Sequence, residues 1–156
     1  MIHMERPGQE PLRIEYILID FEGTLAVDRR VDPKAKDKMN LLSRRTKIYV
    51  LVQGQDQMAE EVLKKVKAEI VHLKEGKSSL EKLNLLNELG SQRTVAIGNG
   101  LDDVAMVEKA GLGICVISKE GTASEMVGKA DLVVANILDA LDFLLKPMRQ
   151  QATLSK

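Results

Sequence analysis

The sequence predicts an α/β protein built as a three-layer α/β/α sandwich around a mainly parallel sheet. Short apolar runs rich in β-branched residues alternate along the chain with longer stretches whose apolar residues recur at helical spacing. A strand followed by a helix returns to the sheet through a crossover, which makes neighbouring strands parallel and covers both faces of the sheet. The strand-like runs are Tyr16–Asp20, Lys47–Val52, Glu69–Leu73, Thr94–Gly98, Gly113–Ile117 and Leu132–Val134.

The first 15 residues depart from this alternation. Ile2–Glu5 and Leu12–Glu15 have the pattern of two short strands, and the segment RPGQEP between them contains a Pro-Gly turn signal. We therefore expect residues 1–15 to form a hairpin that extends one edge of the sheet.

The helical stretches carry recognisable start and stop signals. Asp32-Pro33 predicts the cap and first turn of a helix that runs to about Arg45. Ser78-Ser79-Leu80-Glu81 has the spacing of a capping box for a helix over Leu80–Leu89, which Gly90 ends. The other expected helices follow Asp56, cover 101–110 and 122–128, and follow Asn136, the last one stopping before Pro147. Residues 148–156 are expected to be a flexible tail.

The composition is typical of one soluble domain that spans residues 1–156. Lys and Arg together number 23, as do Asp and Glu, so the formal net charge is zero. General binders of nucleic acid or of anionic membranes carry a basic surplus, so neither partner is expected. Aromatic residues make up only 3% of the chain, which disfavours a platform for stacking bases.

The sequence also favours a cytoplasmic location. The start MIHMERPGQEP lacks the apolar core of a secretory signal, and no window approaches the ~20 apolar residues of a membrane-spanning helix. Cys115 is the single cysteine, which excludes an internal disulfide and suits a reducing compartment.

Polar and charged residues follow several of the predicted strands, at the edge where open α/β sheets form their sites. Asp20-Phe21-Glu22-Gly23-Thr24 leaves the first strand of the sheet, and Asn99-Gly100-Leu101-Asp102-Asp103 leaves a later one. A carboxylate at a strand end can attack phosphorus and form an aspartyl phosphate. Oxygen ligands from two loops can hold Mg²⁺, and Mg²⁺ with a lysine offsets the charge of a phosphoryl group in transfer.

Five segments of the chain resemble the haloacid dehalogenase (HAD) superfamily. They are DFEGTLAVD, IYVLVQG, EKLNLLNELG, VAIGNGLDDVAMVEKAGLGICVIS and NILDALDFLLKP, and they occur in the order of that family. The resemblance spans roughly Leu12 to Pro147. More narrowly, the chain is similar to the small capless members described as soluble P-type ATPase-like hydrolases.

The resemblance implies a Mg²⁺-dependent phosphohydrolase and assigns roles to the catalytic and phosphate-binding residues. Asp20 matches the nucleophile, and Glu22 stands where the family has its general acid/base. Gln53 and Gly54 stand where the family binds phosphoryl oxygens. The phosphate-binding lysine is either Lys77 or Lys82: Lys77 lies just before a helix as in many relatives, and Lys82 fits the narrower subgroup.

The resemblance likewise implies the ligands of the metal. Asp20 and the backbone carbonyl of Glu22 would contribute from the first strand end. Asp103 matches the last acid of the metal site, Asn99 stands at its first acid, and Asp102 stands where P-type pumps have Asn.

Three positions depart from the family pattern, and they predict a phosphohydrolase of low efficiency. Glu22 is one methylene longer than the usual Asp, Gln53 replaces a hydroxyl residue, and Asn99 removes one negative charge from the metal site. The alternative is a weak or inactive HAD-fold protein that binds a phosphorylated ligand or a partner protein.

The chain has no room for a cap domain. Between Asp20 and Lys47 lie 26 residues, and between Gln53 and Lys77 lie 23, which one helix and its connections fill in each case. The site is therefore expected to be open, to accept a phosphorylated substrate of unknown identity, or to be covered by a second subunit of a homo-oligomer. By analogy with the fold, the hairpin at residues 2–15 is the expected subunit contact.

Other motif interpretations are weaker. Gly76-Lys77-Ser78 resembles the end of a P-loop, but Val71 stands where its first glycine belongs. Gly98-Asn99-Gly100 follows a strand as a dinucleotide motif does, yet Asp103 stands in place of the third glycine and would repel a pyrophosphate. A receiver domain carries its phosphorylated Asp on a later strand, and nothing in the chain spans a membrane as a transport pump does.

Overall fold

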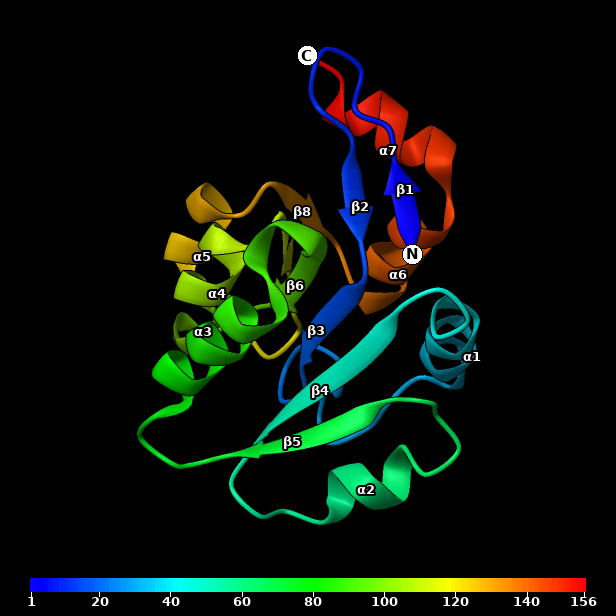
Figure 1. Ribbon diagram of the computed structural model, residues 1–156. Coiled ribbons are helices and arrows are strands. Elements are labelled where there is room, and N and C mark those ends of the chain that lie inside the picture. The colour runs from blue at the N-terminus through cyan, green and yellow to red at the C-terminus, as the bar shows by residue number, and fades with distance from the viewer.

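The computed structural model describes residues 1–156 and has a six-stranded parallel sheet between two layers of helices (Figure 1). The strand order is β5-β4-β3-β6-β7-β8, and all five neighbouring pairs run parallel. The strands are β3 (Tyr16–Asp20), β4 (Lys47–Gln53), β5 (Glu69–Leu73), β6 (Thr94–Gly98), β7 (Leu112–Val116) and β8 (Leu132–Val134). The α/β class and the absence of a cap domain are confirmed.

Helices cover both faces of the sheet, as Figure 1 shows. One face carries α3, α4 and α5, and the other carries α1, α2 and α6. The sheet therefore separates two apolar cores, of 12 and 30 buried residues respectively. The helices are α1 (Pro33–Leu42), α2 (Met58–Val62), α3 (Ser78–Leu89), α4 (Val104–Lys109), α5 (Ser124–Lys129), α6 (Ile137–Leu145) and α7 (Pro147–Leu154), with short 3₁₀ turns η1 (Ser91–Arg93) and η2 (Leu101–Asp103).

Most predicted elements are confirmed to within a few residues. The strand expected at 113–117 begins and ends one residue earlier, and the helix expected at 101–110 opens with the 3₁₀ turn η2. Asp32 caps α1 by accepting a hydrogen bond from the backbone N of Lys34, and Asn136 caps α6 by accepting one from Asp139.

The predicted capping box at Ser78–Glu81 is wrong. Helix α3 begins two residues earlier than expected, at Ser78, and its first turn has no side-chain cap of that kind. The Ser78 hydroxyl instead accepts a hydrogen bond from Gln53 Nε2, and the Glu81 carboxylate accepts one from the backbone N of Lys74. Tertiary contacts from β4 and from the preceding loop therefore take the two side chains that the local pattern assigned to the cap.

The hairpin exists, but its expected place at the sheet edge is wrong. Strands β1 (Ile2–Met4) and β2 (Leu12–Ile14) pair with each other as a separate two-stranded antiparallel sheet. Strand β2 leads into β3, which already has β4 and β6 on its two sides, so no edge is open to the hairpin there. The hairpin projects from the sheet beside α7 (Figure 1). Its four inward residues, Ile2, Met4, Leu12 and Ile14, are buried in the larger core.

Residues 147–154 form helix α7 where a flexible tail was expected. The reason is a single polar side chain: Gln150 is 1% exposed, and its Nε2 donates to the carbonyl oxygens of Phe143 (2.8 Å) and Leu144 (3.2 Å). These carbonyls belong to the last turn of α6, where the helix leaves them without a partner of its own. Gln150 therefore joins α7 to α6 across Pro147.

The C-terminus lies at the hairpin turn, whereas the N-terminus lies at the other end of β1 (Figure 1). The backbone N of Lys156 donates to the carbonyl oxygen of Pro7 (2.9 Å), and Gln9 Nε2 donates to that of Leu154 (2.6 Å).

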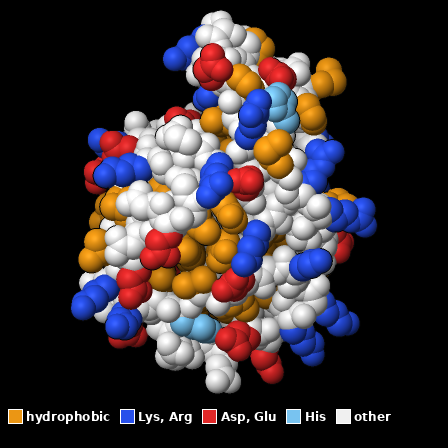
Figure 2. All heavy atoms as spheres, viewed as in Figure 1, with side chains coloured by type: hydrophobic (Ala, Val, Ile, Leu, Met, Phe, Trp, Pro, Cys, Tyr) orange, Lys and Arg blue, Asp and Glu red, His pale blue; other side chains and the backbone are white.

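The surface carries both signs of charge. On the face seen in Figure 2, Lys and Arg side chains are interspersed with Asp and Glu, in keeping with the zero net charge. None of the helices has the length and apolar character required to cross a bilayer.

Gln150→Ala tests the link between α6 and α7. The variant leaves two buried carbonyl groups without a donor, so the free energy of unfolding is expected to fall by about 1–3 kcal/mol. Urea denaturation measures the change, and Gln151→Ala, on the exposed side of the same helix, is the matched control. Equal stability of the two variants would contradict this role of Gln150.

Candidate active site

The carboxyl ends of β3, β4 and β6 bring the predicted site residues together at one edge of the sheet. Asp20 ends β3 and Gln53 ends β4. Asn99 follows β6 directly and leads into η2, which contains Asp102 and Asp103. Parallel neighbours place these three ends side by side, because β3 lies between β4 and β6.

Lys82 is the centre of this cluster. Its side chain is fully buried, and Nζ lies 3.0 Å from Asp20 Oδ1, 2.9 Å from Asp102 Oδ2 and 2.7 Å from Asp103 Oδ1. An ammonium group has three N–H donors, so all three are engaged by carboxylates. Burial alone would lower the pKa of Lys82, but the three carboxylates outweigh it and raise the pKa above its ordinary value, so Lys82 is charged.

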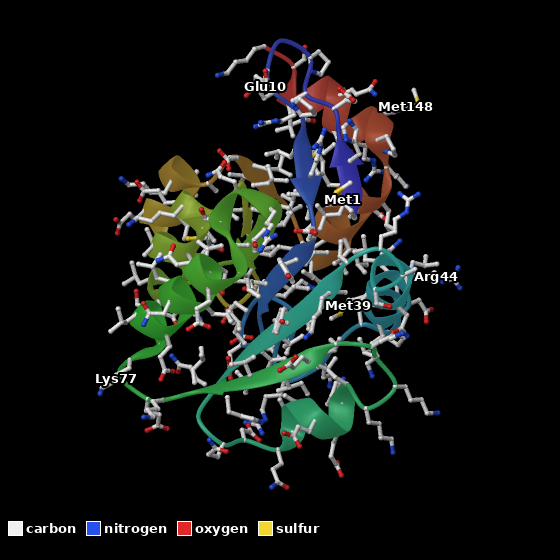
Figure 3. All side chains as sticks on the ribbon, viewed as in Figure 1. Met1, Glu10, Met39, Arg44, Lys77 and Met148 are labelled. Carbon is white, nitrogen blue, oxygen red and sulfur yellow. The ribbon has the colours of Figure 1, made fainter.

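Lys77 does not join the cluster. Its residue is exposed, and Figure 3 shows it at the outer end of the loop between β5 and α3. The buried residues of α3 are Ser78, Lys82 and Leu86, spaced by four, so they form one face of the helix. A lysine in the middle of that stripe is the sequence signal that separates Lys82 from Lys77.

Asp20 is a buried carboxylate with partners on both oxygens. It is 4% exposed, and its Oδ2 lies 3.0 Å from the hydroxyl of Thr24, while Oδ1 accepts from Lys82. Burial raises the pKa of Asp20 well above its ordinary value, the charge of Asp103 adds to this effect, and Lys82 offsets only part of it. The ionised form of Asp20 is therefore held at an energetic cost to the fold.

Asp103 connects the loop after β6 to Lys82. Its side chain is fully buried, and Oδ2 accepts hydrogen bonds from the backbone N–H groups of Asn99 and Gly100, both at 3.1 Å. A Cβ on Gly98 would lie 2.5 Å from the Asp103 side chain, so only glycine lets the strand end pass so close. Asp103 therefore fixes the loop as well as the ammonium.

Glu22 lies beside the cluster without joining it. Its Oε1 accepts a hydrogen bond from the backbone N of Gln53 at 3.1 Å. The residue as a whole is exposed, but desolvation of its carboxyl group raises its pKa, and the hydrogen bonds from the backbone only partly oppose this. A raised pKa suits a carboxylic acid that must donate a proton near neutral pH.

Gln53 extends from β4 towards α3 and η2. Its Nε2 donates to Ser78 Oγ at 3.0 Å and to Asp102 Oδ2 at 3.2 Å. Burial would raise the pKa of Asp102, but Lys82, Ser78 and Gln53 together lower it, so Asp102 is ionised near neutral pH. Gly54 follows with φ of 69°, a conformation that favours glycine, and its carbonyl oxygen accepts a hydrogen bond from His72 Nδ1.

Asn99 and Thr24 complete the other side of Asp20. The Thr24 hydroxyl is buried and lies 2.9 Å from Asn99 Oδ1 as well as 3.0 Å from Asp20 Oδ2. Asn99 Nδ2 donates to the carbonyl of Gly121. Thr24 and Ser78 are the two site residues that the sequence analysis left unassigned. Thr24 stood in the quoted first motif, whereas Ser78 had been assigned to a helix cap.

The oxygen donors around Asp20 fit a hard divalent cation. Asp20 Oδ2 and Asn99 Oδ1 both face the Thr24 hydroxyl, and three aspartate side chains surround the single ammonium of Lys82. No group of three or more His, Cys, Asp and Glu side chains is arranged to hold a metal by itself. Mg²⁺ does not need such a cage, because it keeps several waters and takes one or two carboxylates plus a phosphate oxygen.

A cavity of about 410 Å³ opens next to Glu22. Its wall is formed by the loop after β3, the start of α2 and the loop before α5. The lining residues are Phe21, Glu22, Ala26, Asp28, Arg29, Asp56, Met58 and Glu120.

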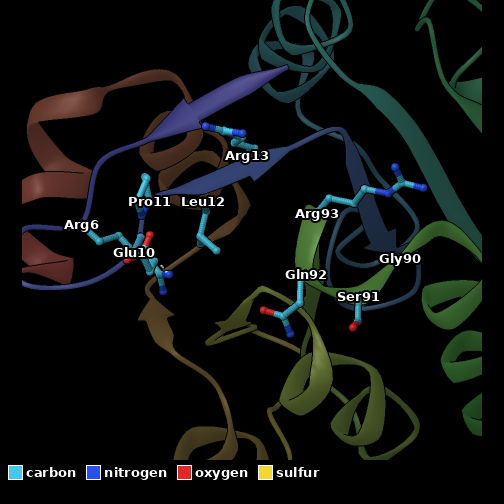
Figure 4. Close-up of a pocket in the computed structure, with 9 residues that line it drawn as sticks. All are labelled: Arg6, Glu10, Pro11, Leu12, Arg13, Gly90, Ser91, Gln92 and Arg93. Atoms are coloured by element: carbon cyan, nitrogen blue, oxygen red, sulfur yellow. Dashed lines mark hydrogen bonds between the residues drawn. The ribbon is translucent and has the colours of Figure 1, made fainter.

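Another cavity, of about 710 Å³, lies elsewhere (Figure 4). It is a polar hollow between the hairpin and η1, whose residues directly precede β3 and β6, and so it faces the amino ends of these strands. The guanidinium groups of Arg6 and Arg93 donate there to the backbone carbonyls of Glu10 and Leu89. The cavity shares no residue with the cluster around Lys82.

Solved structures with the same fold include a protein assigned to the HAD-family hydrolases and two phosphatases. The cobalt-bound deoxy-D-mannose-octulosonate 8-phosphate phosphatase of Haemophilus influenzae is 12% identical with a TM-score of 0.70, and 91% of each chain is covered. The 3-deoxy-D-manno-octulosonate 8-phosphate phosphatase of Moraxella catarrhalis, in complex with magnesium, phosphate and KDO, is 15% identical with a TM-score of 0.66, covering 90% of this chain and 89% of that one. A protein from Streptomyces avermitilis assigned to the HAD-family hydrolases is 18% identical with a TM-score of 0.69, covering 88% and 89%.

Sequence comparison gives a nearer relative. No protein-family model matches the chain. The uncharacterized protein MJ0073 of Methanocaldococcus jannaschii is 43% identical over 84 residues, which are 51% of this chain and 90% of that protein. The narrower resemblance to soluble P-type ATPase-like hydrolases stays an expectation. The chain therefore belongs to one family with MJ0073 and has the capless α/β fold of the HAD-family hydrolases.

Proposed function

We propose that the protein is a Mg²⁺-dependent phosphohydrolase of the HAD type that acts through an aspartyl phosphate. The observation that carries the proposal is the buried carboxylate of Asp20 at the end of β3, held between Lys82 and Thr24. The neighbours in fold add support, because two of them are phosphatases and were seen with magnesium or cobalt.

In the first step, an oxygen of Asp20 attacks phosphorus and the bond from phosphorus to the leaving oxygen breaks. Glu22 gives its proton to that oxygen, so the product leaves as a neutral alcohol. The raised pKa of Glu22 favours the protonated form that this step requires. The cavity beside Glu22 is the space for the leaving group.

In the second step, water attacks the phosphorus of the aspartyl phosphate. Glu22, now ionised, accepts a proton from that water, the bond from Asp20 to phosphorus breaks, and inorganic phosphate leaves. Both Asp20 and the protonated Glu22 are thereby restored for the next cycle.

The remaining residues hold charge in place. Lys82 and the amide of Gln53 are the donors for the phosphoryl oxygens, and Asp103 keeps Lys82 at the end of β3. Asp20, Asn99, the backbone carbonyl of Glu22 and Asp103 are the residues that would hold Mg²⁺. The bound ion would supply positive charge to the phosphoryl group as negative charge develops on it.

The engaged side chains support a low rate. Both N–H bonds of the Gln53 amide have partners in the protein, and all three donors of Lys82 are paired with carboxylates. We place this activity in the cytoplasm. A second copy of the chain is the proposed cover of the open site, with the hairpin as its contact.

Replacing the nucleophile separates activity from stability. Asp20→Asn is expected to reduce Mg²⁺-dependent hydrolysis of an aryl phosphate to background. Because the raised pKa means that the ionised carboxylate disfavours the folded state above that pKa, the variant should also have a higher Tm than the wild type without metal, by a few degrees if about 1 kcal/mol is recovered. Asp37→Asn, an exposed change on α1, is the control. A variant that keeps its hydrolysis would refute the role of Asp20.

Glu22→Gln tests the proton donor through the leaving group. We expect turnover to fall about 10²–10⁴-fold on an alkyl phosphate, whose poor leaving group needs a proton. With an aryl phosphate, formation of the aspartyl phosphate should survive, so stopped-flow should show a burst of about one product per enzyme before a slow phase. In the wild type, activity on the alkyl phosphate should decline as the pH rises through the raised pKa of Glu22. Equal losses on both substrates without a burst would exclude this assignment.

The low efficiency has its own test. In the double variant, Glu22→Asp shortens the proposed acid by one methylene. Gln53→Thr replaces the amide that is bonded to Ser78 and Asp102 with a hydroxyl. Since a displacement of about 1 Å can cost about 10²-fold in rate, we expect kcat on an aryl phosphate to rise about tenfold. Unchanged or lower kcat would show that these two residues are not the handicap.

A further inference from the structure

The donors proposed for the phosphoryl group are already occupied by a carboxylate of the protein. Asp102 Oδ2 lies 2.9 Å from Lys82 Nζ and 3.2 Å from Gln53 Nε2. The second N–H bond of Gln53 is held by Ser78, so the amide is oriented towards Asp102. One oxygen of Asp102 therefore stands where side chains from β4 and α3 converge.

Lys82 has no spare donor for a substrate. Its three N–H bonds are paired with Asp20, Asp102 and Asp103. A phosphoryl oxygen that binds Lys82 must therefore take the place of one of these three carboxylates.

Asp102 is the carboxylate that can leave. The Asp103 side chain is fully buried, and its other oxygen is fixed by two backbone N–H groups. The Asp20 side chain is 6% exposed and is the proposed nucleophile, whereas that of Asp102 is 29% exposed. Asp102 can turn towards solvent and remain ionised there without leaving a buried charge unpaired.

From these contacts we infer that the Asp102 carboxylate occupies the phosphoryl-oxygen position of the free protein, and that a phosphate group binds Lys82 and Gln53 by displacing it. The inference rests on the proposed function and deepens it, because it makes Asp102 an internal competitor for substrate. Only a ligand that interacts with Lys82 and Gln53 better than Asp102 does can enter, which selects dianionic phosphate monoesters over carboxylates and monoanionic diesters.

The test is calorimetric titration of inorganic phosphate, with Mg²⁺ present, into the wild type and Asp102→Asn. The neutral isostere competes less for Lys82, so phosphate should bind about tenfold more tightly. Asp102→Ser, which removes the side-chain reach altogether, should give at least the same gain. Glu75→Gln removes one charge from the exposed loop before α3 and is the matched control, with no gain expected.

The hydrolysis assay separates failure of this inference from failure of the proposed function. Tighter phosphate binding in both Asp102 variants and not in Glu75→Gln supports the displacement. Equal gains in all three variants would mean that the loss of any negative charge strengthens phosphate binding, which would overturn the inference. Weaker phosphate binding in Asp102→Asn would mean that Asp102 contributes to the phosphate site, which would overturn the inference too. If the wild type hydrolyses aryl phosphates while the Asp102 variants bind phosphate no better, the inference alone is wrong. If folded wild type and variants neither bind phosphate nor hydrolyse the ester, the function is wrong as well.

A direct signal accompanies the displacement. In the wild type, the side-chain amide resonances of Gln53 should shift when phosphate is added, because Nε2 exchanges one acceptor for another. In Asp102→Ser the free protein should already lack the resonance position of the paired amide. Gln53 resonances that do not respond to saturating phosphate would contradict the exchange.

Discussion

The buried ammonium of Lys82 is the interaction on which the rest of the site depends. It lies on the sheet-facing stripe of α3, and its partners come from the end of β3 and from η2 after β6. Two aspartates buried side by side would repel each other without it, and a lysine buried without them would carry an unpaired charge. Each buried charge is therefore stable only because the others are present. The Nζ atom of Lys82 thereby joins helix α3 to the ends of β3 and β6.

One of the three residues that depart from the HAD pattern, Gln53, is joined to this cluster. Its Nε2 donates to Asp102, one of the three carboxylates that pair with Lys82. The site is therefore better described as a set of contacts than as a list of single replacements. In that set, the amide of Gln53 and the carboxylate of Asp102 belong together.

How much the sequence predicts depends on whether a feature has a local signal. The strands of the sheet were placed well because their apolar runs are short and bounded by polar residues. The position of the hairpin was predicted wrongly, because strand order is a property of the whole sheet and β3 has neighbours on both sides. Helix α7 was missed because its one buried residue, Gln150, is polar. The strand-end residues lie together as expected, but the choice of Lys82 over Lys77 depends on the true start of α3 at Ser78. The hydrogen bond between Gln53 and Asp102 joins two distant segments, so no local pattern predicts it.

The contacts between the hairpin turn and the C-terminal end of α7 join segments that are made at different times during synthesis. The hairpin is made first, yet the helix that lies against it, α7, is made last, after all six strands of the sheet. The bonds from Gln9 to Leu154 and from Lys156 to Pro7 close almost the whole chain into one loop. Such distant contacts form late, because ordering a long loop precedes any gain from closing it. The hairpin therefore gains its contacts with the end of α7 only after the sheet and its helices have been made.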